Sequence, residues 1–340
     1  MEQTKVAIIG AGPAGTTCAL LLRKKGIDCI LIDRATFPRD KICGGGLTPR
    51  SYKLLQRLLP EFKYNYNSVQ RMKLCIDGEQ VLDFRMKEDL RIVKRREFDA
   101  QLLDTYLKGG GQFINEPLTA IEEQGKKVIA TLKSGRQIEC DYLVGADGAN
   151  SRVRKYLNPH CSHGILCMEQ YAPKSPENAV VVNLSRNYDQ GYYYSFPNEA
   201  ADVQGFGDNR TTPASYRKVL NEMGCPELKS LGAYIPLTTD YPLKNRIILI
   251  GDAGGFPSRL TCEGIFYAML TASHAAEAIA TGHPFCVVNK KIFDKKRAEQ
   301  RFAHHFYSDK GLALLRFCSK HLPSLVAAIF NKKAGRMPKT

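Results

Sequence analysis

The sequence predicts an α/β protein in which a doubly wound, mostly parallel sheet is interrupted by a β-rich layer and followed by a helical C-terminal tail. Two observations carry this prediction. Residues 5–33 read as strand, glycine turn, helix and strand, which is the pattern of a βαβ unit. After a long β-type region, residues 245–255 return to a buried strand that ends in small residues. These features predict a Rossmann-like domain that is discontinuous in the chain.

The first half of the chain alternates between helical and β-type patterns. Asp77-Gly78 suits the tight turn of a hairpin, because both residue types tolerate the backbone conformation that such a turn requires. The patterns predict a helix at residues 51–59, the hairpin at 71–86, a helix at 95–111 and strands from 112 to 144.

The second half is β-type between residues 162 and 243, apart from a helix near 214–223, and mostly helical after residue 263. We therefore divide the chain into a nucleotide-binding domain, a β-rich substrate-binding domain and a helical basic C-terminal region. Their residues are 1–63, 94–161 and 244–286 for the first, 64–93 and 162–243 for the second, and 287–340 for the third.

Composition is typical of a globular protein. The 340 residues are 44% hydrophobic and 24% charged, which excludes a disordered chain. The sequence has no signal-peptide pattern and no apolar stretch of about 18 residues, so we expect a cytoplasmic protein. Eleven cysteines without any CxxC pair fit a reducing compartment and no disulfide framework.

The formal net charge of +15 is concentrated at the C-terminal end. Residues 290–340 contain 13 Lys or Arg and three acids, a net charge of +10, around the apolar segment GLALLRFCSKHLPSLVAAIF. Such a segment suits helices that lie on an anionic membrane surface, or helices that pack on the body of the protein with a solvated basic face. Because no nucleic-acid recognition motif accompanies the charge, no nucleic-acid partner is expected.

Three glycines, Gly10, Gly12 and Gly15, form a GxGxxG pattern directly after a strand and at the start of a helix. This pattern suits a tight turn whose backbone approaches a pyrophosphate at the helix N-terminus. Asp33 follows at the end of the next strand, where a carboxylate can accept hydrogen bonds from ribose hydroxyls. The alternative for Asp33 is a carboxylate that only caps a turn.

Two further strand ends carry an aspartate among small residues. In YLVGADGANSRVR, residues 142–154, a strand leads to Asp147, and Asn150 or Ser151 can cap the helix that follows. In ILIGDAGGFPS, residues 248–258, Asp252 can bind a ribityl hydroxyl. Each segment alone is compatible with an ordinary strand-to-helix turn, but three in this order indicate a dinucleotide site.

This series of motifs resembles the FAD-dependent group that includes p-hydroxybenzoate hydroxylase and geranylgeranyl reductase. The resemblance implies FAD as the cofactor, with the first motif on its ADP half and Asp252 at its ribityl or pyrophosphate portion. It also implies a cofactor contact for Arg95, which precedes a Phe-Asp pair by three positions. The cofactor residues expected on this basis are Gly10, Gly12, Ala14, Gly15, Asp33, Arg34, Arg95, Asp147 and Asp252.

The segment KICGGGL, residues 41–47, is similar to the Lys-x-Cys-Gly-Gly segment of geranylgeranyl reductases and of bacterial CbrA-like proteins. The resemblance places Cys43, Gly44 and Gly45 at the flavin. Glycines there would let the backbone lie close to the flavin edge. Cys43 would relay a proton or steady a charge if Arg39 or Lys41 lies near its sulfur. The alternative is a cysteine that only packs against the cofactor.

A second reductase marker is the Tyr-x-Trp-x-Phe-Pro segment that lines the substrate cavity. The corresponding YYYSFP has Tyr192, Phe196 and Pro197 in the matching positions, with Tyr194 where tryptophan is usual. The chain contains no tryptophan, which puts an isoprenoid substrate in question and also argues against flavin-dependent halogenases.

The segment LTCEGIFYAM, residues 260–269, resembles the Gly-Glu-Gly-Ile segment of the reductases, with Cys262 in place of the first glycine. The match places Gly264 and Ile265 at the flavin. A helix starting near Glu263 would direct amide N–H groups at the flavin ring. The alternative is a helix cap with an acid in its first turn.

Other reactive side chains give weaker patterns. His160, Cys161, His163 and Cys167 cluster in the sequence but lack a second ligand pair, so no metal is expected. His274 is interpreted as a packed imidazole.

Three functions are compatible with the sequence. We favour an FAD-dependent oxidoreductase that reduces carbon-carbon double bonds of a prenyl or lipid-like substrate, with its basic tail on the inner face of a membrane. The second is a monooxygenase of an aromatic or apolar substrate, which shares all three motifs. The third is a flavin-binding regulatory or envelope-related protein with little turnover. The electron donor, NADPH or a small redox protein, is not evident.

Overall fold

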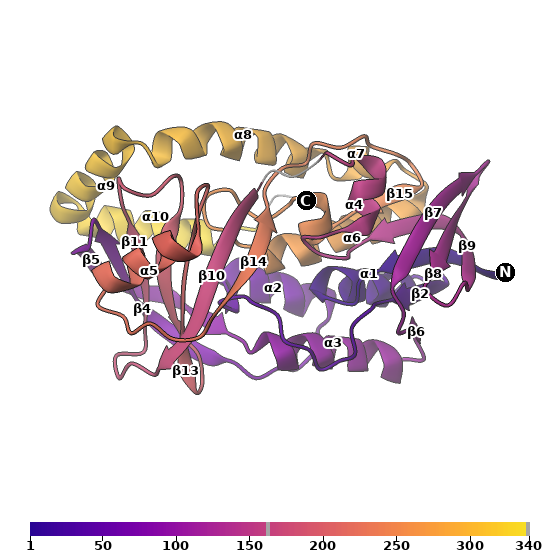
Figure 1. The fold of residues 1–340 in the computed structure, drawn as a ribbon, viewed down its shortest axis with the longest axis horizontal. Helices are drawn as coiled ribbons and strands as arrows, with labels where there is room; N and C mark the ends of the chain where they lie inside the picture. Colours follow the sequence, from indigo (N-terminus) through magenta and orange to yellow (C-terminus); the bar gives the residue numbers. More distant parts are fainter. Residues whose placement is uncertain (161–163, 338–340) are drawn as a thin grey trace.

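The computed structural model describes residues 1–160 and 164–337, which form two sheets with helices around them (Figure 1). The predicted fold class is confirmed: an α/β nucleotide-binding fold adjoins a β-rich sheet, and the C-terminal region is helical. The domain boundaries given above stay a prediction.

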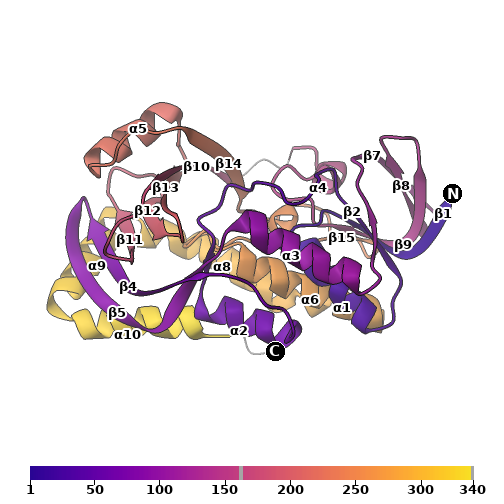
Figure 2. The same cartoon turned by 90° about the horizontal axis from the view of Figure 1, so that it is seen from below.

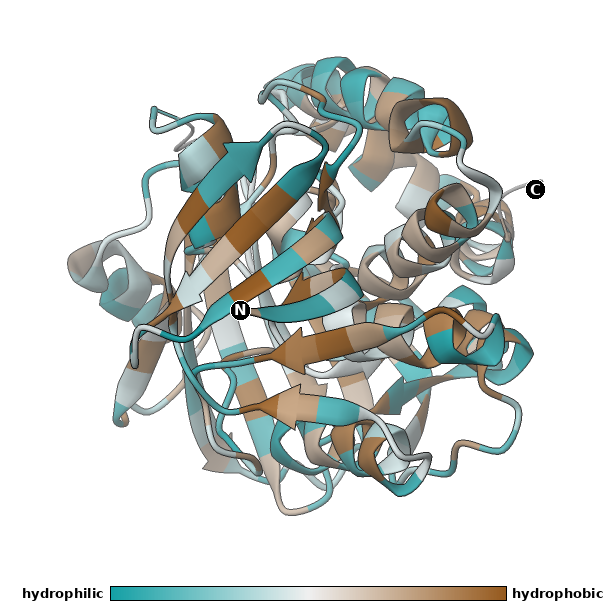
Figure 3. Ribbon diagram, turned by 90° about the vertical axis from the view of Figure 1, so that its right-hand side faces the viewer, coloured by the Kyte–Doolittle hydropathy of each residue, from teal (hydrophilic) through white to brown (hydrophobic). Residues whose placement is uncertain are grey.

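The first sheet has the strand order β6-β2-β1-β9-β8-β7, with β15 paired to β9. β1, β2, β6, β9 and β15 run parallel, whereas β7 and β8 form an antiparallel extension. Figure 3 shows the apolar character of the strands near the N-terminus. The strand bounds are β1 Glu2–Ile9, β2 Cys29–Ile32, β6 Gln112–Ile114, β7 Leu118–Gln124, β8 Lys127–Leu132, β9 Gln137–Gly145 and β15 Ile247–Leu249.

Both faces of this parallel sheet are buried, which explains why its strands read as continuous apolar runs. Val6 and Ile8 belong to the core formed with the helices, while Ala7 and Ile9 belong to the core formed with β7 to β9. Figure 2 shows α1, α3 and α6 along one face. The helices of this part are α1 Pro13–Lys24, α2 Pro49–Leu58, α3 Arg95–Lys108, α4 Arg152–Leu157 and α6 Ile265–Thr281.

The second sheet has eight strands in the order β14-β10-β13-β12-β11-β4-β5-β3. Its neighbours are antiparallel except β4 and β11. The predicted hairpin turn is confirmed, with Asp77 and Gly78 at φ values of 53° and 80°. The elements are β3 Gly46–Leu47, β4 Asn67–Ile76, β5 Glu79–Ile92, β10 Gly164–Pro173, β11 Ala179–Leu184, β12 Tyr192–Pro197, β13 Ala201–Asp208, α5 Pro213–Glu222 and β14 Ser230–Pro236.

The C-terminal helices pack on this second sheet. Tyr307, Leu312 and Val326 share a buried core with Leu74 and Leu184 of the strands, so the tail is a packed part of the body. No single described helix is long and apolar enough to span a membrane, although α9 and α10, bent at 114°, pass such a test as a pair. The helices are α7 Phe285–Val288, α8 Lys290–Phe306, α9 Asp309–His321 and α10 Pro323–Gly335.

Candidate active site

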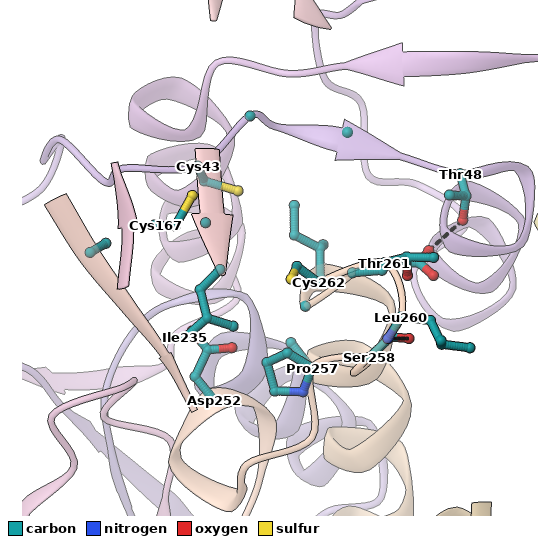
Figure 4. Close-up of a pocket in the computed structure, with 18 of the residues that line it drawn as sticks. Cys43, Thr48, Cys167, Ile235, Asp252, Pro257, Ser258, Leu260, Thr261 and Cys262 are labelled. Atoms are coloured by element: carbon teal, nitrogen blue, oxygen red, sulfur yellow. Dashed lines mark hydrogen bonds between the residues drawn. The ribbon is translucent and has the colours of Figure 1, made fainter. Parts of the chain in front are cut away.

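A cavity of about 1840 Å³ extends from the glycine turn after β1, past β10 to β12, to the C-terminal helices. Figure 4 shows part of its wall, where Cys43, Cys167 and Cys262 come from three separate segments. Ligand pockets usually measure about 300–1,000 Å³. The cavity is therefore large enough for a cofactor and a second molecule.

The glycine turn has two kinds of glycine. A Cβ on Gly10, whose φ is +107°, would lie 2.3 Å from the carbonyl oxygen of Ala146, and a Cβ on Gly15 would lie 1.8 Å from that of Gly10. These two positions need glycine so that β1, α1 and β9 can pack closely. Gly12 instead borders the cavity, where a Cβ would meet only the guanidinium of Arg39, at 3.4 Å, among the described residues. The space beside Gly12, at the N-terminus of α1, is a cradle suited to a pyrophosphate.

Asp33 fixes the shape of this turn. Its carboxylate accepts hydrogen bonds from the backbone N–H groups of Ala11, at 2.6 Å, and Ala35, at 2.8 Å. Asp33 and its neighbour Arg34 also line the cavity, as does Ala14, whereas Gly15 does not. The turn-capping role that the sequence left open is therefore present, and a ribose contact at Asp33 stays a prediction.

Asp147 caps α4. Its carboxylate accepts hydrogen bonds from the hydroxyl of Ser151, at 2.5 Å, and the backbone N–H of Arg152, at 2.6 Å. Burial raises the pKa of Asp147, and these donors oppose the rise. Ser151 is the helix cap, as one of the two predicted candidates, because its Oγ accepts from the N–H of Arg154 at 2.9 Å. Asp147 lines the cavity, but its carboxylate is held by the protein itself.

The second and third motifs are tied together by one buried side chain. The guanidinium of Arg154 donates to the carbonyl oxygens of Asp252, at 3.0 Å, and Ala253, at 3.2 Å. The carboxylate of Asp252 faces the cavity and has no hydrogen-bond partner within the described part of the chain. A free carboxylate there can accept hydrogen bonds from sugar-alcohol hydroxyls. The cradle at Gly12 and this carboxylate fit FAD.

The loop that contains Cys43 crosses from the first sheet to the second, where Gly46 begins β3. The sulfur of Cys43 accepts a hydrogen bond from the N–H of Gly45 at 3.4 Å and lies beside the guanidinium of Arg95. Arg95 also donates two 2.8 Å hydrogen bonds to Asp99.

Arg95, and neither Arg39 nor Lys41, is thus the basic group that the structure places at the sulfur. Arg39 instead pairs with Asp99 at 3.3 Å. Burial lowers the pKa of Arg95, but Asp99 and Cys43 more than offset this effect, so the pKa of Arg95 is raised. The cofactor contact of Arg95 stays a prediction, and its position beside Cys43 was not expected from the sequence.

The two glycines after Cys43 are needed because neighbouring residues of the protein leave no room for a side chain. A Cβ on Gly44 would lie 2.7 Å from the ring of Phe196, and one on Gly45, whose φ is +72°, would lie 2.1 Å from the carbonyl oxygen of Val93. We expected these glycines to admit the flavin edge. The structure shows that they also admit β5 and the aromatic side chains of β12.

Alternate residues of β12 form an aromatic wall. Tyr192, Tyr194 and Phe196 line the cavity, with ring centroids 6.0 Å apart for the first pair and 4.8 Å for the second. Pro197 is on the other face and does not line the cavity, since successive strand residues point to opposite faces. The structure therefore brings three of the four expected substrate residues together.

Glu263 links two helices. It accepts hydrogen bonds from Ser51, at 2.8 Å, and Arg50, at 3.0 Å, and a further bond from Thr48, drawn in Figure 4. The helix α6 begins only at Ile265, with Gly264 as its cap, so Glu263 is at the N-terminus of α2 and not in the first turn of α6. Gly264 and Ile265 line the cavity as expected.

Two groups of cavity residues were missed. Glu169 on β10 is only 4% exposed and accepts a hydrogen bond from the hydroxyl of Tyr194. Its only signal is a single acid inside the apolar run ILCMEQYA. The other group comes from the C-terminal helices and includes Phe302, Phe306, Leu315, Val326 and Phe330. Their apolar pattern was visible, but not which surface they would cover.

Two further expectations concern a metal site at residues 160–167 and the role of His274. Cys161 and His163 are outside the described residues. In residues 1–160 and 164–337 no group of three or more His, Cys, Asp or Glu could hold a metal ion. His274 contacts Asn289 through Nδ1 at 2.7 Å, and burial lowers its pKa, as a packed imidazole requires.

Comparisons with known proteins agree with this geometry. The FAD binding domain family matches residues 3–165. Menaquinone reductase of Mycobacterium tuberculosis is 28% identical over 95% of this chain and 86% of its own length. The chloroplastic geranylgeranyl diphosphate reductase of Nicotiana tabacum is 27% identical over 82% of this chain and 66% of its own length.

Among solved structures, a geranylgeranyl bacteriochlorophyll reductase-like protein from Thermoplasma acidophilum has the same fold, with a TM-score of 0.82. The two chains are 18% identical, and the match covers 98% of this chain and 96% of that one. The fold, the motif loops and the matching domain define an FAD-dependent oxidoreductase. Within this class, the chain is similar in sequence to a menaquinone reductase and a geranylgeranyl diphosphate reductase, and similar in fold to a geranylgeranyl bacteriochlorophyll reductase-like protein.

Proposed function

We propose that this oxidoreductase reduces carbon-carbon double bonds of a prenyl or lipid-like substrate. The observation that carries the proposal is the apolar extension of the cavity. Beyond the motif loops its wall is formed by Leu74, Val182 and Leu184 of the second sheet and by the aromatic side chains of β12. The C-terminal helices close the other side with further apolar side chains.

The names of two relatives support this substrate class. One refers to menaquinone and the other to geranylgeranyl diphosphate, and both molecules carry polyprenyl chains. A long flexible hydrocarbon gains free energy from burial at about 25 cal/mol per Å² of apolar surface. An elongated apolar cavity therefore suits such a chain better than a small polar metabolite.

The residues of this chain would divide the work in the following way. Gly12 and the N-terminus of α1 would hold the pyrophosphate, Asp252 would hold the ribityl hydroxyls, and the N–H groups at Gly264 and Ile265 would stabilise charge on the ring. Reduced FAD, when bound, supplies a hydride to the substrate. The electron donor that reduces it, NADPH or a small redox protein, is left open.

We also propose that the C-terminal helices rest on an anionic membrane surface. Six large apolar side chains between the start of α8 and the end of α10 are exposed: Phe302, Leu314, Phe317, Leu322, Leu325 and Ile329. Three of them, Phe302, Leu314 and Ile329, also line the cavity, so the cavity wall reaches the surface among them. Exposed Lys310, Lys332 and Lys333 on the same helices complement anionic headgroups. A lipid would then enter from the inner face of the membrane.

The test is anaerobic reduction of the purified holoenzyme followed by addition of menaquinone or geranylgeranyl diphosphate, then of total lipid extract. A product heavier by two hydrogens is expected. In a parallel reaction to which oxygen is admitted, gain of one oxygen would instead support a monooxygenase, the rival that shares the FAD motifs. No product with either chemistry would overturn both and favour a flavin-binding role with little turnover.

A further inference from the structure

Glu169 is a buried carboxyl group in the wall of the cavity, and one of its two oxygens has no hydrogen-bond partner among the described residues. It lies on β10 and is 4% exposed. Its Oε1 accepts a hydrogen bond from the hydroxyl of Tyr194, whereas Oε2 is buried and has no hydrogen-bond partner among the described residues. A buried charged oxygen without a partner is costly, so a proton on Oε2 is the favourable state.

The charges around Glu169 decide how firmly it holds this proton. Burial raises the pKa of Glu169 to about 7, although the hydrogen bond from Tyr194, the charge of Lys41 and the backbone N–H of Cys43 each lower it in part. The titratable and charged groups that face it come from the loop before β3, from α3, from its own strand, from β12 and from α5. They are Lys41, Arg95, Cys167, Tyr171, Tyr194 and Tyr216.

The position of Glu169 is at the junction of the two parts of the cavity. Tyr194 belongs to the aromatic wall, and its ring lies next to Gly44 of the loop that carries Cys43. Glu169 itself lines the cavity beside Cys167, which Figure 4 shows near Cys43. A proton on Oε2 is therefore close to the cofactor residues and to the expected substrate wall at once.

Cys43, the proton donor considered first, has the opposite surroundings. The N–H of Gly45 donates a hydrogen bond to its sulfur, and the positive charge of Arg95 lies beside it. Glu169 accepts the hydrogen bond of Tyr194 on Oε1, and its Oε2, buried in the cavity wall, is the oxygen that can carry a proton.

We propose that Glu169 is the general acid of the reaction and that Tyr194 is its positioning residue; this inference rests on the proposed double-bond reduction. Two electrons and one hydrogen reach the first carbon as a hydride from reduced FAD. The O–H bond at Oε2 breaks, and its proton forms the new C–H bond at the neighbouring carbon. The carboxylate that remains keeps the hydrogen bond from Tyr194 and later takes a proton from water.

The kinetic test follows oxidation of pre-reduced holoenzyme by menaquinone or geranylgeranyl diphosphate at a series of pH values. In the native protein the rate should fall as the pH rises through about 7, because only protonated Glu169 donates. Glu169→Gln should retain FAD, react at least about 100-fold more slowly, and lose this fall in rate, the pH limb near 7. Tyr194→Phe should move the limb to higher pH, since the removed hydrogen bond lowers the pKa of Glu169.

Tyr193→Phe is the matched control, because this tyrosine is on the opposite face of β12, contacts Cys225 and does not line the cavity. It should leave the limb in place. Equal rates and equal pH profiles for the native protein and Glu169→Gln, with product formed by both, would overturn the role of Glu169 while leaving the proposed function intact.

A second readout needs no turnover. Infrared difference spectra between acid and neutral pH should contain a carboxyl C=O band that titrates near pH 7, is absent in Glu169→Gln and titrates higher in Tyr194→Phe. If the native protein reduces neither substrate, the proposed function fails, and this band still decides whether Glu169 holds a proton. Its absence from the native protein would overturn the inference.

Discussion

At the residue scale, several side chains have a geometry that no sequence pattern specifies. Cys262 has a φ of +50°, in the left-handed region that disfavours residues with a Cβ. The sequence resemblance places it at the first glycine of the Gly-Glu-Gly-Ile segment. The sequence indicated the substitution but not the dihedral angle, because that angle depends on how the loop after Pro257 meets the N-terminus of α6.

Replacement of Cys262 tests this strain. A left-handed backbone costs a residue with a Cβ about 1–2 kcal/mol. Glycine avoids this cost but loses about 0.4–1 kcal/mol of stability because its unfolded state is more flexible. We expect Cys262→Gly to be more stable than Cys262→Ala by about 0.5–1 kcal/mol in the free energy of unfolding. Denaturant titration of both variants measures the difference. Both variants lack the sulfur, so their difference reports the backbone alone. Equal or greater stability of Cys262→Ala would contradict the interpretation.

Cys43→Ala tests the remaining role of the thiol. We expect FAD to stay bound, because the cradle beside Gly12 and the carboxylate of Asp252 are unchanged, and product formation to slow by about 10–100-fold. That range corresponds to the loss of one interaction with a charged group, about 1.5–3 kcal/mol. Cys225→Ala, outside the cavity, should react at the native rate. A native rate for Cys43→Ala would leave the thiol with a packing role, and loss of the pH limb near 7 would transfer the acid role to it.

At the element scale, the elements with strong local signals were predictable and those defined by their partners were not. The hairpin at Asp77-Gly78 and the cap at Ser151 follow from local turn and capping chemistry. By contrast, β3 has only two residues and exists because β5 pairs with it. Glu263 looked like part of its own helix, but its hydrogen bonds join it to α2, which is more than 200 residues away in the sequence.

The exposed apolar side chains of α9 and α10 carry a prediction about membrane binding. Phe317 and Leu325 are 58% and 53% exposed and do not line the cavity. Their joint replacement by serine should lower the affinity for anionic vesicles by about tenfold or more, since each buried side chain contributes about 1.5–3 kcal/mol. Raised salt should weaken binding further. Co-sedimentation with vesicles measures both effects.

The control for this experiment is replacement of Leu228 and Leu243 by serine, because both are exposed elsewhere on the protein. Affinity that falls equally in both double variants, or in neither, would contradict the proposed membrane surface. Deleting the chain after Phe306 would be a poor test, because it also removes Leu312 and Val326 from the core and part of the cavity wall.

At the scale of the whole molecule, the cofactor half was predictable because each motif reports its own local chemistry. The turn after β1 and the strand ends at Asp147 and Asp252 could be identified one at a time and then placed in order. The substrate half depends on contacts between distant segments. The sequence of the tail shows apolar helices, but only the fold shows that they close the cavity over the second sheet.

The hydrogen bonds of Arg154 have a consequence for how the protein acquires its flavin. They join the turn after β9 to the turn after β15 through groups that belong to the chain alone. Two of the three cofactor loops are therefore held in register by the protein's own contacts, and FAD does not have to order them as it arrives. A preorganised cradle reduces the entropic cost of association. Loading of FAD should accordingly be a single second-order step, without a slow phase of loop closure after encounter.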